Sequence, residues 1–225
     1  MDTGKTKNLI ERVITPHGVI WNFLRAIYHF VKSAFRRIAK NGIFLFEGEL
    51  QMASSEHPLK LGKTLELFNP LSVLDVGCGT GWSIEYLLTR GIDVIGLEGS
   101  ELAIRKAKHP ERIEKCDLRR ELNLTRRFDM IWCIEVVEHV HPSHVHNLMR
   151  TFVNHSDRVV MSAAKPGQGG EGHFNEQPPE YWIELFAQYG YGYDESSTQI
   201  LRQLKECYSE SMLVFCRKGN LSQQG

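Results

Sequence analysis

The sequence has few cysteines, and none of them stands in a regular pair. Five cysteines occur among 225 residues, and no two are spaced as CxxC. This spacing argues against a disulfide framework and against a structural zinc site. Unpaired cysteines fit a reducing compartment best, so we expect a cytoplasmic protein.

The sequence also lacks long apolar runs and an excess of either charge. No segment reaches the ~18 apolar residues of a membrane-spanning helix, and the N-terminus lacks the apolar stretch of a secretory signal. The 27 basic side chains equal the 27 acidic ones, so the overall charge favours neither a nucleic-acid nor a membrane partner. With 42% hydrophobic residues, the chain fits one globular domain with a small appendage.

The appendage is predicted at residues 1–45. Between residues 19 and 38 the apolar side chains recur at helical spacing and form one broad apolar face. Residues 1–40 hold eight Lys and Arg against two Asp and Glu, so this helix is basic and amphipathic. Two interpretations stay open, a lid or dimer contact and a peripheral contact with an anionic membrane. Residues 219–225 are expected to form a disordered tail.

From residue 46 to 218 the sequence alternates strand and helix patterns, which is typical of a doubly wound α/β sheet. Strands are expected over residues 72–76, 93–97, 112–116, 128–134, 158–163 and 212–216. Helices are expected over about 81–90, 100–108, 143–153 and 179–189. These elements predict one domain with its ligand site at the carboxyl ends of the strands.

The first expected strand runs into a glycine-rich loop, Gly77 to Gly81, and then into a helix. Glycines permit positive φ in the turn, let backbone amides approach a ligand, and let the helix pack closely on the strand. The spacing is GxGxG, and Trp82 stands where the last glycine of GxGxxG would stand. A nicotinamide cofactor is therefore disfavoured.

Acidic residues follow the next two strands at the same edge of the sheet. Glu98 follows the second strand, where a carboxylate can accept hydrogen bonds from both ribose hydroxyls. By itself it would fit a helix start equally well, with Ser100 as N-cap. Asp117 and Leu118 follow the third strand and suit an adenine amino group and a ring face. Three strand ends therefore converge on one nucleoside.

These residues resemble the class I, Rossmann-like S-adenosylmethionine-dependent methyltransferases over about residues 71–216. The resemblance implies a seven-stranded sheet of order 3-2-1-4-5-7-6 whose last strand, residues 212–216, is antiparallel. It also implies S-adenosylmethionine as the cofactor. The predicted cofactor-binding residues are Asp75, Gly77, Cys78, Gly79, Gly81, Glu98, Gly99, Ser100, Asp117, Leu118 and Cys133.

Acids and imidazoles follow the fourth strand. Methyl transfer from a sulfonium is an in-line displacement, so the protein aligns the acceptor and, where needed, removes its proton. Glu135, Glu138, His139 and the later His173 offer ligands for Mg²⁺ or Mn²⁺. This pattern resembles the metal site of small-RNA 2′-O-methyltransferases and, less fully, a stretch of ubiquinone-pathway O-methyltransferases. Without a metal, His139 or His173 is the candidate general base; purely structural roles also stay open.

A long glycine-rich loop after the fifth strand, residues 163–179, is predicted to lie over the acceptor. We expect a methyltransferase that acts on a hydroxyl of a small-molecule acceptor. One alternative is a metal-dependent RNA-end 2′-O-methyltransferase, which would need an electropositive channel beyond Arg119, Arg120, Arg126 and Arg127. The others are a noncatalytic cofactor-binding protein that acts through its N-terminal helix and a nicotinamide-dependent oxidoreductase.

Overall fold

The computed structural model describes residue 27, residues 56–170 and residues 172–217. The chain divides into two compact units, residues 1–40 and 41–225, and every strand below belongs to the second. The predicted extension, residues 1–45, lies outside the described residues except for Ile27, and the predicted tail, residues 219–225, lies outside them entirely. The proposed lid, dimer and membrane contacts of the basic helix therefore stay predictions.

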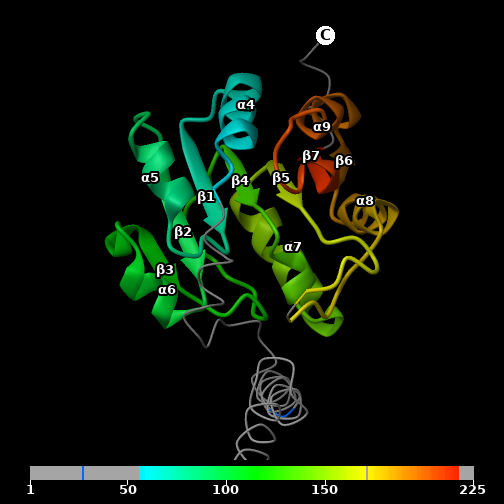
Figure 1. Ribbon diagram of the computed structural model, residues 1–225, viewed down its shortest axis with the longest axis horizontal. Helices are drawn as coiled ribbons and strands as arrows, with labels where there is room; N and C mark the ends of the chain where they lie inside the picture. The colour runs from blue at the N-terminus through cyan, green and yellow to red at the C-terminus, as the bar shows by residue number, and fades with distance from the viewer. Residues whose placement is uncertain (1–26, 28–55, 171, 218–225) are drawn as a thin grey trace, which may run out of the picture. The chain divides into compact units, whose positions relative to one another are not determined.

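The second unit is built on a seven-stranded sheet of order β3-β2-β1-β4-β5-β7-β6 (Figure 1). Its strands are β1 (Ser72–Val76), β2 (Asp93–Glu98), β3 (Ile113–Lys115), β4 (Met130–Cys133), β5 (Arg158–Ser162), β6 (Tyr191–Tyr193) and β7 (Met212–Arg217). Strands β1 to β5 pair in parallel, and β7 pairs antiparallel with both β5 and β6. The predicted strand order and antiparallel last strand are confirmed.

Helices cover both faces of this sheet. They are α4 (Pro58–Phe68), α5 (Trp82–Leu88), α6 (Glu101–Lys106), α7 (Val145–His155), α8 (Pro179–Gln188) and α9 (Glu195–Arg202), with short 3-10 turns η1 (Pro110–Arg112), η2 (Val137–His139), η3 (Pro142–His144) and η4 (Ser209–Ser211). Helices α7 and α8 join one core through side chains such as Phe152 and Phe186. Helices α4, α5 and α9 join the other through Leu61, Ile84 and Leu201.

The central strands contribute side chains to both cores, because successive side chains of a strand point to opposite faces of the sheet. In β1, Val73 belongs to one core and Leu74 to the other; in β4, Met130 and Ile131 divide in the same way. All four are fully buried. Burial on two faces explains why these strands are apolar almost throughout. Each such side chain stabilises the fold by about 1.5–3 kcal/mol.

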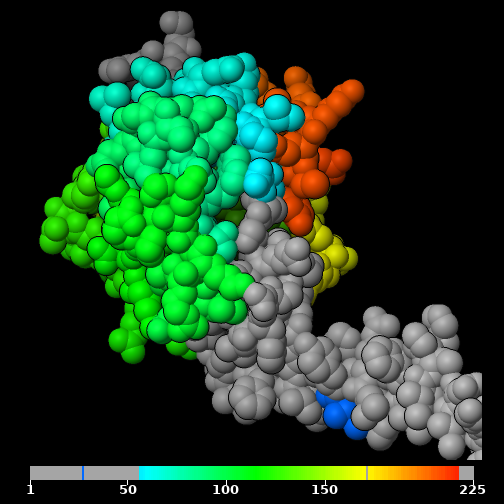
Figure 2. Space-filling view, turned by 60° about the vertical axis from the view of Figure 1, so that its left-hand side comes forward, coloured from blue at the N-terminus to red at the C-terminus, as the bar shows by residue number. Residues whose placement is uncertain are grey.

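Helix α4 is fixed at its start by a residue far along the chain. The Glu206 carboxylate accepts hydrogen bonds from Leu59 N at 3.0 Å and from Lys60 N at 2.9 Å, and the Lys60 ammonium donates to the Cys207 carbonyl. Figure 2 shows α4, in cyan, beside the orange segment that contains α9 and the residues after it. The carboxylate satisfies amide groups that the first helical turn leaves without partners.

Helices α4 and α9, strand β6 and the 3-10 turns η1 to η4 were not among the elements located from the sequence. Strand β6 has only three residues, with glycine in the middle. Helix α9 has Asp194 as its N-cap, and the Asp194 side chain accepts from Ser197 N. Within the described ranges, no helix has the length and apolar character needed to cross a membrane.

Candidate functional site

The glycine loop lies at the carboxyl end of β1, with every glycine in the left-handed region. The φ angles of Gly77, Gly79 and Gly81 are 74°, 55° and 77°. A Cβ at Gly77 would lie 2.4 Å from Cγ2 of Val136, so the loop passes too close to the β4 end for any side chain there. Gly77 N and Cys78 N both donate to Leu97 O, at 2.8 and 3.2 Å. The ends of β1, β2 and β4 therefore meet here, as a backbone cradle for a nucleoside requires.

Glu98 lies at the end of β2 and is only 6% exposed. Its carboxylate accepts from Gly79 N at 2.9 Å and from Ser100 N at 2.7 Å. Burial raises the pKa of Glu98, and these backbone hydrogen bonds oppose that shift. The carboxylate thus holds the glycine loop to the start of α6, where Ser100 is the N-cap and accepts from Ala103 N.

Two other predicted cofactor residues lie beneath the loop. Asp75 is 3% exposed and accepts from the Ser83 hydroxyl. Burial raises the pKa of Asp75 to about 7, with the Ser83 hydrogen bond opposing and Glu98 adding to the shift. Cys133 is fully buried in the core at the end of β4. In this structure Asp75 supports the loop, and the Cys133 side chain packs in the core.

Asp117 lies just beyond β3, beside the partly buried Leu118. Its carboxylate is paired with the Arg119 guanidinium, with Nε at 2.8 and 3.1 Å from the two oxygens and Nη2 at 2.7 Å. The hydrogen bond from Arg119 lowers the pKa of Asp117. An adenine amino group at Asp117 would share this carboxylate with Arg119.

Glu138, His139 and His173 lie close together, and we call them the acceptor-side cluster after the role predicted for them. One potential metal-ligating atom of each lies within 4.8 Å of the others, and the two imidazole centroids are 4.9 Å apart at an interplanar angle of 84°. Glu138 is fully buried, and neither of its carboxylate oxygens has a hydrogen-bond partner of ordinary geometry. Burial, and then the neighbouring Glu135 carboxylate, raise the pKa of Glu138 well above its ordinary value. A buried carboxyl group without such a partner can bind a cation or form a hydrogen bond with a bound substrate.

The two imidazoles are oriented through their Nδ1 atoms. His139 Nδ1 lies 3.1 Å from Gly172 O, and His173 Nδ1 lies 2.9 Å from the Glu176 carboxylate. An imidazole that donates through Nδ1 presents Nε2 as its lone-pair nitrogen, the arrangement common among metal-ligating and basic histidines.

Glu135, the fourth predicted metal ligand, takes no part in this three-residue group. Its φ is 54°. Its backbone amide donates to Ser162 Oγ at 2.9 Å, and Ser162 Oγ donates to its carboxylate at 2.7 Å. Glu135 is thus held against β5, and three of the four predicted ligands come together.

The glycine-rich loop, residues 163–179, docks on the same cluster. Phe174 N and Asn175 N both donate to Glu138 O, at 2.9 and 3.0 Å. Asn175 is 1% exposed, and its Nδ2 has no hydrogen-bond partner. Sequence patterns did not single out Glu176, which contacts His173 from the same loop. Its three-residue spacing from His173 was the available signal.

Residues 50–196 match the family model described as a methyltransferase domain. Among curated relatives, the ubiquinone biosynthesis O-methyltransferase of Bradyrhizobium diazoefficiens is 37% identical over 84 residues, which are 35% of this chain and 33% of that protein. The chain spans about a third of the length of the first curated relatives it matches.

Solved structures share the fold. The SAM-bound amino pentose methyltransferase CalS10 of Micromonospora echinaspora superposes with a TM-score of 0.59 at 16% identity, covering 78% of this chain and 98% of that chain. The methyltransferase domain of a bacterial Hen1 gives 0.54 at 20% identity, with 71% and 98% covered. At these identities the likeness concerns the fold alone.

Proposed function

Because the chain belongs to the class I S-adenosylmethionine-dependent methyltransferases, we propose that it methylates a hydroxyl of a small molecule, with Glu138, His139 and His173 as the acceptor-side group. The observation that carries this proposal is the buried Glu138 carboxyl, which has no hydrogen-bond partner of ordinary geometry and lies next to two oriented imidazoles. Leaving a buried polar group unpaired costs about 1–3 kcal/mol, which a bound cation or substrate would offset.

The donor side fits the cofactor. The methyl group would come from the sulfonium of S-adenosylmethionine. The backbone of Gly77 and Gly79 would hold its methionine end, Glu98 its ribose, and Asp117 with Leu118 its adenine. The positive φ angles of Gly77, Gly79 and Gly81 support this assignment, because glycines of this kind let a loop backbone approach a ligand without interference from Cβ atoms.

The acceptor-side cluster could remove the proton of the acceptor hydroxyl in either of two ways. Glu138, His139 and His173 would hold a divalent cation such as Mg²⁺ or Mn²⁺, which when bound acidifies a coordinated hydroxyl. In the other arrangement, the Nε2 atom of His139 or His173 takes the hydroxyl proton directly. Asn175 Nδ2, buried and without a partner, would donate to a second oxygen of the acceptor.

A small acceptor is favoured over RNA by the state of the candidate arginines. Arg119 pairs with Asp117, while Arg126 and Arg127 pair with aspartates outside the cluster. Arginines neutralised in this way contribute little to a phosphate-binding channel. The names of the relatives, a ubiquinone biosynthesis O-methyltransferase and an amino pentose methyltransferase, also support a small-molecule acceptor.

The test is turnover of S-adenosylmethionine with a panel of catechols and polyhydroxylated small molecules, read as release of S-adenosylhomocysteine. We expect turnover on at least one acceptor and tight calorimetric binding of S-adenosylhomocysteine but not of NAD. Loss of turnover in EDTA that returns with Mg²⁺ or Mn²⁺ supports the cation; EDTA-resistant turnover leaves the histidine base. Binding of NAD alone would overturn the proposal. Liposome binding that requires residues 1–40, with no turnover, would favour the noncatalytic alternative.

A further inference from the structure

One carboxylate joins the glycine-rich loop to the acceptor-side cluster. Glu176 Oε2 accepts from Gly167 N at 2.8 Å, and Oε1 accepts from Gly169 N at 2.8 Å. The same Oε1 lies 2.9 Å from His173 Nδ1. A single side chain, 18% exposed, therefore contacts two points of the loop backbone and one imidazole.

We propose that Glu176 is a positioning residue that fixes the His173 ring and the glycine-rich loop as one unit, so that Nε2 of His173 faces the acceptor hydroxyl or its cation. This inference rests on the proposed function of His173. Glu176 acts through His173 and backbone amides, and it makes no contact of its own with the predicted cofactor residues among the contacts found for it.

The loop backbone is shaped to reach this one carboxylate. Gly167 and Gly169 both have positive φ, 82° and 69°, and alternating backbone conformations of this kind turn amides toward one anion. A Cβ at either residue would meet nothing within 4 Å. Glycine is therefore needed at these positions for the direction of the backbone, and not for space.

Gly170 is needed for a different reason. A Cβ there would lie 2.3 Å from Nε2 of His173 and 2.4 Å from its Cε1, so any other residue would cover the nitrogen that the proposal requires. On the other imidazole, His139 Nδ1 contacts Gly172 O of the same loop. The loop thus orients both imidazoles, one through a backbone carbonyl and one through Glu176.

The variants are chosen to separate positioning from a general effect of lost charge. Glu176→Ala removes all three contacts, and Glu176→Gln keeps one acceptor oxygen. Glu180→Ala, the matched control, removes an exposed carboxylate from the adjoining helix α8. Gly170→Ala displaces the His173 ring while leaving the Glu176 contacts to the loop in place.

The direct readouts need no acceptor: hydrogen exchange at the Gly167 and Gly169 amides, and ¹⁵N chemical shifts of the His173 ring. In Glu176→Ala we expect both amides to lose protection and the ring to exchange between tautomers, with Glu176→Gln intermediate and Glu180→Ala like the parent. Gly170→Ala should change only the ring shifts. Mn²⁺ alone, titrated by electron paramagnetic resonance, should bind about 10–100-fold more weakly to Glu176→Ala.

Turnover is a separate readout. Glu176→Ala should lower kcat about 10–100-fold without changing KM for S-adenosylmethionine. Unaltered amide protection and ring shifts in Glu176→Ala would overturn the positioning role, whatever happens to turnover. If instead those readouts change as expected but the parent protein turns over no acceptor, the proposed function fails and the positioning role stands.

Discussion

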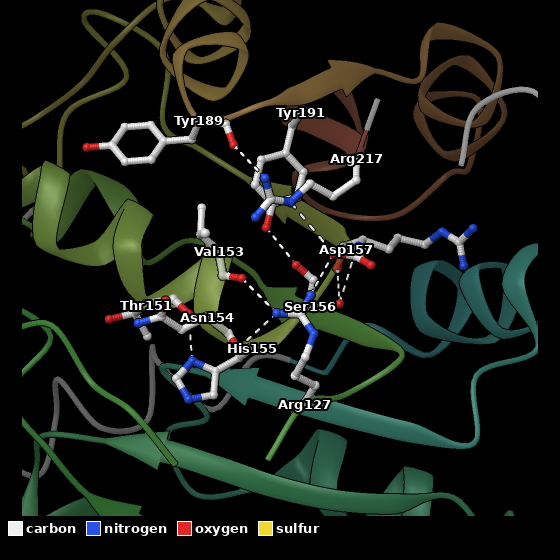
Figure 3. A network of polar contacts seen from close by, with 11 residues as sticks. Arg127, Thr151, Val153, Asn154, His155, Ser156, Asp157, Tyr189, Tyr191 and Arg217 are labelled. Carbon is white, nitrogen blue, oxygen red and sulfur yellow. Dashed lines mark hydrogen bonds and ion pairs between the residues drawn. The ribbon is translucent and has the colours of Figure 1, made fainter. Parts of the chain in front are cut away.

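At the amino ends of its strands the sheet pairs charged and polar groups with one another, whereas at the carboxyl ends it leaves buried polar atoms without protein partners. At the amino edge, Asp157 lies 2.6 Å from Arg127 Nη2 and 3.6 Å from Arg217 Nε (Figure 3). The buried Tyr191 hydroxyl donates to Ser156 O at 2.7 Å. These contacts link the starts of β5 and β6 to the end of β7.

The carboxyl edge also holds paired groups, such as Glu98, but it differs at Glu138 and Asn175. Both Glu138 oxygens and Asn175 Nδ2 are buried without a hydrogen-bond partner of ordinary geometry. An unpaired nitrogen also exists at the amino edge, Arg158 Nε, but that guanidinium stacks on the Phe68 ring at 4.4 Å. On the function proposed above, this difference separates an edge whose paired groups stabilise the fold from an edge whose unpaired groups are available to a ligand. Changes at the two edges should therefore separate turnover from stability.

The largest effect is expected from removing the acceptor-side cluster. Replacing Glu138 and His139 together by Ala should lower kcat about 10²–10⁴-fold, the usual contribution of acid–base groups, with an unchanged dissociation constant for S-adenosylhomocysteine. At the other edge, Asp157→Ala should leave kcat as in the parent. Steady-state kinetics of the two variants checks this contrast, and equal losses of kcat in both would contradict it.

A smaller effect is expected where the cofactor loop meets the β4 end. Gly77→Ala should lower the free energy of unfolding for two reasons. The positive φ costs about 1–2 kcal/mol, and the contact of the new Cβ with Val136 at 2.4 Å costs about 1–3 kcal/mol. Denaturant unfolding should show a loss of about 3 kcal/mol. Gly91→Ala is the control, because its φ is 73° but nothing lies within 4 Å. Adding Val136→Ala should recover the steric part, and no recovery would place the strain elsewhere.

The sequence predicted the long buried strands better than the elements that depend on distant contacts. The strand pattern predicted β1 to its exact bounds and β2, β3, β4, β5 and β7 to within two residues at every end, because buried strands are apolar and bounded by turns. Helix α4 was missed because its N-terminal cap, Glu206, lies 146 residues away from Lys60. Strand β6 was missed because three residues give no periodicity.

In the candidate site, too, some features could be predicted from the local sequence and others could not. Glu138 and His139 are adjacent in one short turn, η2, so a local pattern could predict that they lie together. The glycine loop could be assigned to a cofactor only together with Glu98 and Asp117 at the next two strand ends. Spacing does not reveal that the Glu135 carboxylate accepts a hydrogen bond from the Ser162 hydroxyl. Spacing also does not reveal that Arg119 forms an ion pair with Asp117. Both of these contacts depend on side-chain geometry.

The next smaller effect is expected from a substitution of Glu98, which should weaken binding of S-adenosylhomocysteine. Glu98→Gln keeps the shape of the side chain but replaces one acceptor oxygen by a donor, so one of the two ribose hydroxyls would lose its proposed acceptor. Because hydrogen bonds to charged groups contribute about 1.5–3 kcal/mol, the dissociation constant for S-adenosylhomocysteine should rise roughly 10–100-fold. Calorimetry measures this, with the exposed Glu101→Gln as the control. An unchanged constant in Glu98→Gln would refute the ribose role.

The smallest effect is expected at the amino edge. Tyr191 is 1% exposed, and Tyr191→Phe keeps the ring packed while leaving Ser156 O without its donor. The expected loss is about 1 kcal/mol of unfolding free energy, with kcat unchanged because the site lies at the other ends of the strands. Tyr193→Phe, in the same short strand and only partly buried, should change neither quantity. A fall in kcat for Tyr191→Phe would show that the two edges are coupled, and that polar pairing at one edge helps to hold the site at the other.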